Sequence, residues 1–472
     1  MPGWKGPAVN ALDLARWQFG IVTVYHFLFV PLTIGLSFLV AGMQTVWHVK
    51  GDPAYLRLTK FFGRLFLINV AMGVVTGIVQ EFQFGMNWSA YSRFVGDIFG
   101  APLAMEGLLA FFLESTFLGL WIFGWDRLPK RVHLATIWLV SCGTILSAFF
   151  ILAANSWMQH PVGFTINAAK HRAELTSIGA VFTNPTLWVT FPHTIAGAFV
   201  VAGVFVLAIS SWHLARRNEV ELFRPAARMA MVVTLIASIA VAVTGDAQGK
   251  LMTKQQPMKM AAAEALWRDQ QPASFSLLTV GSLNGDHEVW SLRVPRLLSF
   301  LATGSFTGKV EGIDSVQAQE VAKYGAGDYR PSLPVTYWTF RLMIGFGLVS
   351  ALLSALGLWL TRRRRLPASR WFYRAAVLSV GAPFLANSAG WIFTEMGRQP
   401  WVVYGVMPTS AAVSPGVGAG SVLTSLLTYT LLYAALAIIE VRLMLGFIRS
   451  GPEPLADTDA ADLPVPAPAF SY

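Results

Sequence analysis

Two long stretches of this chain contain no charged residue. Asp, Glu, Lys and Arg are all absent from residue 17 to 49 and again from residue 175 to 215. A helix needs about 20 apolar residues to cross a bilayer, so each stretch is long enough for a span. The chain of 472 residues is 13% charged and 54% hydrophobic, whereas a soluble domain carries ~25% charged residues. The sequence therefore predicts an integral membrane protein.

Hydropathy predicts an all-α fold with nine membrane spans. The predicted spans are residues 18–46, 61–83, 101–124, 133–154, 187–213, 226–245, 335–361, 372–395 and 420–447. We expect four parts: a membrane domain (1–245), a long external loop (246–334), a second membrane domain (335–450) and a tail (451–472). The tail is rich in Pro, Ala and Asp, which predicts disorder. We find no inverted halves of the kind that secondary transporters have.

Positive charge predicts the orientation of these spans. The loops that follow spans 1, 3, 5 and 7 hold most of the Lys and Arg between spans: Lys50, Arg57, Lys60, Arg64, Arg127, Lys130, Arg131, Arg216, Arg217, Arg224, Arg228, Arg362 to Arg365, Arg370 and Arg374. Cytoplasmic loops are enriched in these residues. We therefore expect the N-terminus and the long loop outside and the C-terminus in the cytoplasm. This bias accounts for most of the net charge of +10, so no nucleic-acid partner is needed.

The cysteine content limits the metal chemistry. Cys142 is the single cysteine, which excludes an intrachain disulfide and haem attachment through Cys-x-x-Cys-His. Any metal must therefore be held by His, Met or carboxylate groups. The first apolar run is too long for the core of a signal peptide, so we interpret it as a retained anchor.

Several ionisable residues lie inside the predicted spans. His26, Glu106, Glu114 and His193 interrupt uncharged segments, and Glu395 ends another. Such groups are costly at membrane depth and usually serve a function. Glu106 and Glu114 are about 80° and about 12 Å apart on an ideal helix, so both can face one polar seam. The predicted topology places Glu114 at mid-depth and most of the others towards the outside. His48, His133 and His213 are expected at the cytoplasmic interface.

These residue types favour a haem protein but leave alternatives open. A His and a Met that enter from one side can hold a six-coordinate haem iron. Arginines at the same level, such as Arg341 and Arg398, can neutralise haem propionates. The same carboxylates would also suit a membrane transporter or channel. A third alternative is a haem b subunit that only relays electrons.

Five motifs, in order along the chain, resemble subunit I of cytochrome bd-type quinol oxidases. They are Tyr25-His26-Phe27-Leu28-Phe29-Val30-Pro31-Leu32-Thr33, Glu81-Phe82-Gln83-Phe84-Gly85 with Asn87-Trp88, Phe99-Gly100-Ala101-Pro102-Leu103-Ala104-Met105-Glu106-Gly107, Phe111-Phe112-Leu113-Glu114-Ser115-Thr116 and Gly397-Arg398-Gln399-Pro400-Trp401. The resemblance covers residues 12 to 450 and implies the same nine-span fold.

The resemblance also implies roles for single residues. His193 and Met343 would be the axial ligands of a low-spin haem b, with Arg341 beside them. A high-spin haem b and a haem d, or a third haem b in place of haem d, would lie among His26, Glu106 and Glu395, and which residue binds which iron stays open. The remaining implied residues are Trp391 between the haems, Arg398 at a propionate, and Glu114 with Ser147 on the proton route.

The long loop resembles the quinol-binding loop of the short-loop subgroup. Lys259 and Glu264, in Gln256-Pro257-Met258-Lys259-Met260-Ala261-Ala262-Ala263-Glu264, occupy the positions associated with quinol. Taken alone, the two residues would be a solvated helix face. They are about 140° apart on a helix, so contact with one ring would need a bend or long side chains. Ser388 stands where some members carry an acidic residue.

The implied activity is that of an electrogenic quinol:oxygen oxidoreductase in the cell membrane. Quinol, either ubiquinol or menaquinol, would be oxidised at the outer face. Oxygen would be reduced to water with protons from the cytoplasm, so that a proton motive force arises without pumping. The implied partners are subunit II and, in some assemblies, small single-span accessory subunits.

Overall fold

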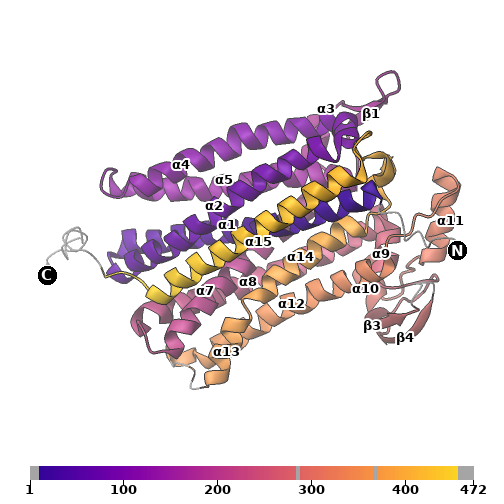
Figure 1. Ribbon diagram of the computed structural model, residues 1–472. Coiled ribbons are helices and arrows are strands. Elements are labelled where there is room, and N and C mark those ends of the chain that lie inside the picture. Colours follow the sequence, from indigo (N-terminus) through magenta and orange to yellow (C-terminus); the bar gives the residue numbers. More distant parts are fainter. Residues whose placement is uncertain (1–9, 283–286, 365–366, 368, 455–472) are drawn as a thin grey trace, which may run out of the picture.

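The computed structural model describes residues 10–282, 287–364, 367 and 369–454, and within these residues nine helical segments are long and apolar enough to cross a membrane. They form one bundle (Figure 1). The nine predicted spans are confirmed, and most helices extend a few residues beyond the predicted edges. The segments are α1 (Ala11–Lys50), α2 (Pro53–Met86), α3–η1–α4 (Ser89–Phe123), α5 (Lys130–Gln159), α7 (Pro185–Ala215), α8 (Val220–Gln255), α12 (Leu333–Leu360), α13–α14 (Arg370–Met396) and α15 (Ala419–Ser450).

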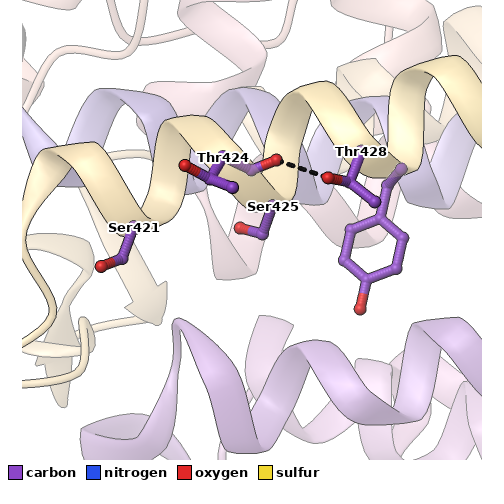
Figure 2. Close-up of a pocket in the computed structure, with 5 residues that line it drawn as sticks. Ser421, Thr424, Ser425 and Thr428 are labelled. Atoms are coloured by element: carbon purple, nitrogen blue, oxygen red, sulfur yellow. Dashed lines mark hydrogen bonds between the residues drawn. The ribbon is translucent and has the colours of Figure 1, made fainter.

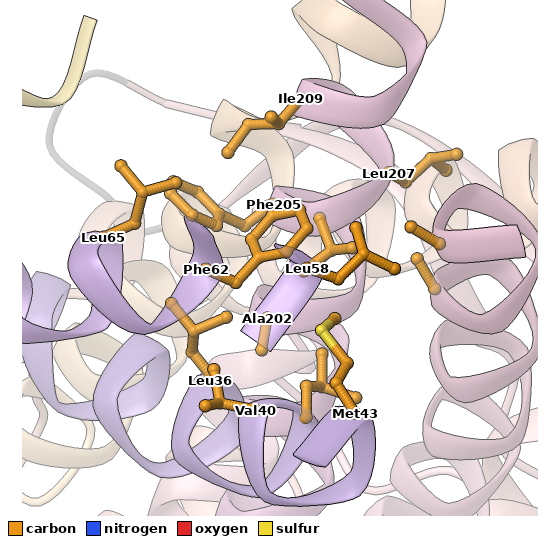
Figure 3. Close-up of a cluster of buried hydrophobic side chains, with 14 of the residues drawn as sticks. Leu36, Val40, Met43, Leu58, Phe62, Leu65, Ala202, Phe205, Leu207 and Ile209 are labelled. Atoms are coloured by element: carbon orange, nitrogen blue, oxygen red, sulfur yellow. The ribbon is translucent and has the colours of Figure 1, made fainter. Parts of the chain in front are cut away.

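Helix α7 lies at the centre of the bundle and is the most buried of the nine. Small residues let it approach its neighbours closely: a Cβ atom on Gly35 of α1 would lie 2.4 Å from the Ala198 carbonyl oxygen. Between membrane helices such close packing supplies much of the attraction. Figure 3 shows side chains of α1, α2 and α7 interleaved, including Leu36, Phe62 and Phe205. The peripheral helices α3–α4 and α15 are the least buried.

The bundle has two different ends. At one end, which we call the basic end, lie the Lys- and Arg-rich loops that follow α1, α4, α7 and α12. Ion pairs connect its parts: Arg57 Nη2 lies 2.7 Å from Glu219 Oε1, and Arg64 pairs with Glu453. At the opposite end, the loop end, lie the chain start and the elements of the long loop (Figure 1). Which end faces the cytoplasm stays a prediction from the charge bias.

Two histidines predicted at the cytoplasmic interface lie near helix ends at the basic end, but their side chains are buried within the protein. His133 is 3% exposed, and its ring nitrogens lie 2.9 Å from Gln44 Nε2 and 2.9 Å from the Trp121 carbonyl oxygen. His213 is fully buried and stacks on the ring of Phe223. The polar and aromatic partners offset the cost of burial in ways that hydropathy alone does not reveal.

The long loop is mostly ordered secondary structure. Helix α8 runs to Gln255, past residue 245, where we expected the loop to begin. The loop then forms α9 (Pro257–Ala263), the antiparallel hairpin β3 (Phe275–Gly281) and β4 (Glu288–Val294), α10 (Leu297–Thr303) and α11 (Ile313–Tyr324). Of the tail predicted to be disordered, only residues 451–454 are among the described residues, and the prediction for 455–472 lies outside them.

Short elements complete the connections. Near the loop end are the antiparallel pairs β1 (Phe164–Asn167) with β2 (Arg172–Leu175) and β5 (Trp401–Val403) with β6 (Met407–Pro408), and the helices α6 (Ile178–Phe182) and η3 (Thr409–Ala411). A 3-10 turn, η2 (Arg362–Arg364), precedes α13. The eighth span is divided into α13 (Arg370–Leu378) and α14 (Gly381–Met396).

Candidate functional site

Two half-buried histidines are held in the same way on different helix pairs. His26 of α1 has its Nδ1 2.9 Å from Thr76 Oγ1 of α2. His193 of α7 has its Nδ1 3.0 Å from Thr244 Oγ1 of α8. Neither Nε2 has a hydrogen-bond partner among the described residues. Imidazoles that bind metals usually donate their other ring N–H to an oxygen in this manner.

His193 and Met343 lie at the same level on two sides of α14. A Cβ atom on Gly197 of α7 would lie 3.1 Å from Asn387 Oδ1 of α14. His193 and Gly390 each lie about one helical turn from this contact towards the loop end, so the two residues lie at a similar depth. A Cβ atom on Gly390 would lie 2.9 Å from Met343 Sδ of α12. The imidazole and the thioether predicted to be a ligand pair therefore share one depth in the bundle.

Trp391 faces the helix that carries His26. Its ring centroid is 6.3 Å from that of Phe19 on α1, and Phe19 in turn contacts Trp88. Phe19 lies two turns from His26 along α1. The tryptophan thus stands between α14 and α1, which fits the predicted position between two cofactor sites.

Glu106 and Glu114 both face α5. Ser147 Oγ donates to Glu106 Oε1 at 2.7 Å, so this serine contacts Glu106 and not Glu114, which we had expected it to accompany. Glu114 packs one turn further from the loop end, where a Cβ atom on Gly143 would lie 3.2 Å from its Cβ. Between the two, η1 (Glu106–Phe111) is a π-helix. Its extra residue per turn rotates Glu114 towards the face that carries Glu106.

Glu395, at the end of α14, has a partner for each carboxylate oxygen. Asn155 Nδ2 donates to Oε1 at 2.9 Å, and Arg398 Nη2 donates to Oε2. Each carboxylate oxygen has a second lone pair, so these two hydrogen bonds leave room for a metal. Arg398 is 2% exposed on its side chain, and its Nε and Nη1 have no hydrogen-bond partner among the described residues.

A hydrogen-bond chain links the long loop to Glu395. Lys259 of α9 is 5% exposed, and its Nζ donates to Gln159 Oε1 at 2.8 Å. Gln159 Nε2 lies 3.5 Å from Glu395 Oε1, a weak contact. Gly397 makes the approach possible, because a Cβ there would lie 2.8 Å from Lys259 Cγ. Burial, and then the charge of Arg398, lowers the pKa of Lys259 to about 7.

Glu264, five residues further on, belongs to a different cluster. It is 1% exposed, accepts the backbone N–H of Ser276 at 3.0 Å, and lies 3.0 Å from Arg341 Nη2. Burial raises the pKa of Glu264, and the charge of Arg341 opposes this shift. The solvated-face interpretation of Lys259 and Glu264 is therefore wrong. The two residues leave α9 in different directions, as their spacing predicted.

Arg341 keeps part of its hydrogen-bonding capacity unused. Its three guanidinium nitrogens are buried and have no aligned hydrogen-bond acceptor among the described residues, although Nη2 forms the ion pair with Glu264. The guanidinium lies 4.7 Å from the Tyr337 ring centroid and 4.8 Å from that of Phe275. A planar guanidinium group held against aromatic rings in this way presents its N–H donors in a fixed geometry, which suits an anionic group such as a carboxylate.

These observations test whether the residues fit haem. Two imidazoles have a free Nε2, a thioether lies level with one of them, and two buried guanidiniums have unused donors near the same end. Within the described ranges no three His, Cys, Asp or Glu side chains converge on one point. A macrocycle that supplies four nitrogens and two propionates fits the imidazole, thioether and guanidinium groups present.

The sequence analysis missed several of these residues. Asn155, Gln159, Thr76 and Thr244 carry no charge, so they do not stand out in an apolar span. One signal was available: Val-Thr-Gly occurs at 75–77 and again at 243–245, each time opposite a span histidine. Gln159 could have been noted as a polar residue at the end of the fourth span.

A pocket on α15 lies apart from this site. Figure 2 shows Ser421, Thr424, Ser425 and Thr428 along one side of the helix, and Tyr429 also lines the pocket. Thr428 donates to the Thr424 carbonyl oxygen at 2.8 Å, and Ser425 donates to Gln18 Oε1 at 2.8 Å. These hydroxyls thus have partners within the protein, and no predicted site residue lines the pocket. We assign it no role.

The fold and the site define a membrane helical bundle with metal-ligand side chains and buried guanidinium groups near one end. The cytochrome bd terminal oxidase subunit I family matches residues 14–452, and the chain belongs to this family. It is 50% identical over 464 residues to cytochrome bd ubiquinol oxidase subunit 1 of Bacillus subtilis (strain 168), with 98% of each chain covered.

Two further similarities support this family assignment. Cytochrome bd-II ubiquinol oxidase subunit 1 of Escherichia coli (strain K12) is 38% identical over 500 residues, which cover 94% of this chain and 97% of the relative. The solved structure of bd oxidase from Geobacillus thermodenitrificans superposes with a TM-score of 0.86 at 28% identity, over 94% of this chain and 99% of that chain. The chain is therefore subunit I of a terminal quinol oxidase of the cell membrane. Family membership implies haem cofactors, a quinol substrate and a subunit II partner.

Proposed function

We propose that this chain oxidises quinol at the loop end and guides protons from the basic end to the site of oxygen reduction. The observation that carries the proposal is the set of buried charges at the loop end, Lys259, Glu264, Arg341 and Arg398, two of which keep unused donors. Ions are expensive to bury, by several kcal/mol each. Their concentration where the long loop meets α12 and α14 supports a charged substrate and cofactor region there.

We propose that His193 and Met343 hold a low-spin haem b, with Arg341 as a partner for a propionate. His26, Glu106 and Glu395 would surround the high-spin haem b and the haem d, or the third haem b that replaces it. Arg398 would bind a propionate of this pair, and Trp391 would lie between the sites. When bound, the haems transfer electrons from quinol to oxygen, which is reduced to water.

Lys259 and Glu264 would take part in quinol oxidation from two sides. Above pH 7 the Lys259 amine is largely neutral, so it can accept a proton from a quinol hydroxyl. Glu264 and Arg341 supply an acceptor and a donor for the opposite side of the ring. If the loop end faces outward, as the charge bias predicts, the quinol protons leave to the outside.

Glu114 would lie on the path of the consumed protons. Its backbone packs against Gly143 of α5, and one turn further Ser147 donates to Glu106. The seam between these helices therefore carries two carboxylates and a hydroxyl in sequence towards the loop end. Proton uptake from the cytoplasm and release outside would separate charge without a pump.

The family decides against a transporter or channel, and one spectrum tests the rest. The complex with subunit II is purified and its reduced-minus-oxidised absorption spectrum is recorded with and without carbon monoxide. We expect a low-spin haem b signal that carbon monoxide leaves unchanged and a high-spin signal that it shifts. The position of the shifted band distinguishes haem d from haem b. A coloured protein that binds no carbon monoxide would contradict the proposal and support an electron-relay subunit.

The same preparation decides the finer points. Oxygen consumption with ubiquinol and with menaquinol, at equal concentrations, shows which quinol is preferred. Mass spectrometry of the intact complex shows whether small single-span subunits accompany subunit II. Reconstitution into vesicles tests whether turnover creates a membrane potential, as an electrogenic enzyme requires.

A further inference from the structure

We propose that Thr76 and Thr244 are positioning residues, each of which fixes a haem-ligand histidine with its proton on Nδ1 and its Nε2 turned to the metal. The inference rests on the proposed function, because it takes His26 and His193 as ligands. It adds two residues on two other helices, and it states what each contributes: the tautomer, the ring orientation and the basicity of the ligand.

The hydrogen bonds of Thr76 determine the tautomer of His26. A hydroxyl has one hydrogen to donate and two lone pairs to accept with. Thr76 Oγ1 donates to the Met72 carbonyl oxygen at 2.9 Å, with the Gly73 carbonyl oxygen at 3.1 Å. Its hydrogen is therefore used within α2, and towards His26 Nδ1, 2.9 Å away, it acts as an acceptor. We therefore assign the proton to Nδ1, which leaves the Nε2 lone pair for a metal.

Thr244 repeats the arrangement on the other helix pair. Its Oγ1 donates to the Ala240 carbonyl oxygen at 2.7 Å and lies 3.0 Å from His193 Nδ1. A ring N–H of His193 also donates to the Val241 carbonyl oxygen, and we assign the proton of this second histidine to Nδ1 as well. The two sites share no residue: one joins α1 to α2 and the other joins α7 to α8. The same hydrogen bond between a histidine Nδ1 and a threonine hydroxyl thus occurs twice in the chain, on two separate helix pairs.

The glycine after each threonine supports the ring from the side. A Cβ atom on Gly77 would lie 3.2 Å from His26 Cε1, and one on Gly245 would lie 3.3 Å from His193 Cε1. Any larger residue would press on the imidazole. The tripeptide Val-Thr-Gly therefore supplies both an acceptor for Nδ1 and a surface against which the ring lies.

A hydroxyl that bonds to its own helix is not enough to make this inference. Buried Thr and Ser often do so in helices, and Thr59 of α2 and Thr234 of α8 are examples: each is fully buried and donates to the carbonyl oxygen four residues earlier, and neither is bonded to a histidine. The contact with the imidazole distinguishes Thr76 and Thr244. Thr59 and Thr234 are therefore matched controls on the same two helices.

The arrangement has a predicted effect on the iron. A hydrogen bond from Nδ1–H makes the ligand more basic and so favours the ferric state. Loss of such an outer-shell partner typically changes metal affinity or activity by about 10–100-fold. A tenfold change in the preference for ferric over ferrous iron corresponds to about 59 mV for one electron. Replacement of either threonine by valine should therefore raise the midpoint potential of its haem.

The test uses the complete complex with subunit II and its haems. We compare Thr244→Val, Thr244→Ser and Thr234→Val by haem content, by spectroelectrochemical titration and by electron paramagnetic resonance of the low-spin haem. We expect Thr244→Val to keep the haem and to shift its resonance. Its midpoint potential should rise by about 59 mV or more, which corresponds to at least a tenfold change in the preference for ferric over ferrous iron. Thr244→Ser should restore both properties, and Thr234→Val should change neither. Thr76→Val, with Thr59→Val as control, should act in the same way on a high-spin signal.

The outcomes separate this inference from the proposed function. An unchanged potential and resonance in Thr244→Val would overturn the positioning role while leaving His193 as a ligand. A low-spin haem that persists in His193→Ala would instead overturn the ligand assignment. If the valine variant does not assemble, Thr244→Ala is measured in its place. It removes the hydroxyl without adding bulk, and the same upward shift is expected.

Discussion

The two ends of the bundle differ in buried charge: among the described residues, the buried Lys, Arg and Glu side chains lie at the loop end, which also carries exposed ion pairs such as Arg330 with Asp328. At the basic end, charged side chains are partly exposed and paired: Arg64 and Glu453 are 44% and 67% exposed, and the Arg216 guanidinium lies 4.0 Å from the Trp212 ring centroid. At the loop end, Arg398 is 2% exposed on its side chain and Lys259 is 5% exposed as a residue, and Arg398 keeps two nitrogens without an acceptor among the described residues.

This difference shows which charges serve topology and which serve chemistry. A solvated charged residue at the end of a membrane helix costs little free energy and directs the orientation in which the helix inserts. A buried charge costs several kcal/mol and persists only where its surroundings need it. The number of charges is therefore a poor guide to function here, and their burial with unused donors is a good one.

The largest effect is expected for Arg398→Gln. The variant leaves the Glu395 carboxylate buried beside Lys259 and Asn155 without its counter-ion. Removal of one partner from a buried pair typically costs about 3–5 kcal/mol. Thermal unfolding of the complex should show this loss together with reduced haem content, and Arg398→Lys should recover part of it. Wild-type stability and haem content in Arg398→Gln would show that the loop end tolerates charge as freely as the basic end does.

A smaller effect is expected for Glu114→Gln, between the two ends. The amide keeps the shape of the carboxylate but cannot carry a proton. Loss of a group that transfers protons typically slows a reaction by about 10²-fold or more. Oxygen consumption should fall accordingly while the spectrum shows every haem in place. Glu440→Gln on the peripheral helix α15 is the control, and full turnover in Glu114→Gln would remove that residue from the proton path.

The pH dependence of quinol oxidation tests Lys259. Because its pKa is lowered to about 7, the amine is neutral above that pH and becomes protonated as the pH falls below it. As a base, it works only when neutral, so kcat/KM should rise with pH through about 7 and then level off. Lys259→Met should be slower and should lack this inflection. Lys254→Met, which changes an exposed lysine of α8, should retain it, and an inflection that survives in Lys259→Met would assign it to another group.

The smallest effect is expected at the basic end. Arg64→Gln breaks the pair with Glu453, and exposed pairs contribute about 0.2–1 kcal/mol. Haem content and turnover should match the wild type, with unfolding shifted slightly at most. A large loss of turnover would show that the basic end has a role beyond orientation.

The fold was predictable because the membrane imposes a simple rule. Each span must satisfy its own backbone hydrogen bonds, so uncharged runs of sufficient length become helices. The extension of α8 to Gln255 was not predictable from hydropathy, since Asp246 and Lys250 end the apolar run while their ion pair, four residues apart, continues the helix. The burial of His133 and His213 depends on partners from distant helices, which no local pattern reveals.

The site was predictable in its charged members and not in its neutral ones. Glu106, Glu264 and Arg341 are conspicuous in the sequence, whereas Thr76 and Gln159 look like ordinary residues of a helix. Their importance arises only when folding places them against an imidazole or between Lys259 and Glu395. The relative orientation of Glu106 and Glu114 likewise depends on the π-helix in the third span, which changes the rotation of the residues after Glu106.

The central claim is that the buried groups at the loop end hold haem, and the low-spin haem b spectrum of Met343→Leu tests it most directly. Leucine keeps the size of the side chain and removes the sulfur that lies level with His193. The account predicts that the variant inserts and assembles with subunit II but loses the low-spin haem b signal, while Met231→Leu, in the apolar core, keeps it. An intact low-spin signal in Met343→Leu would contradict the account.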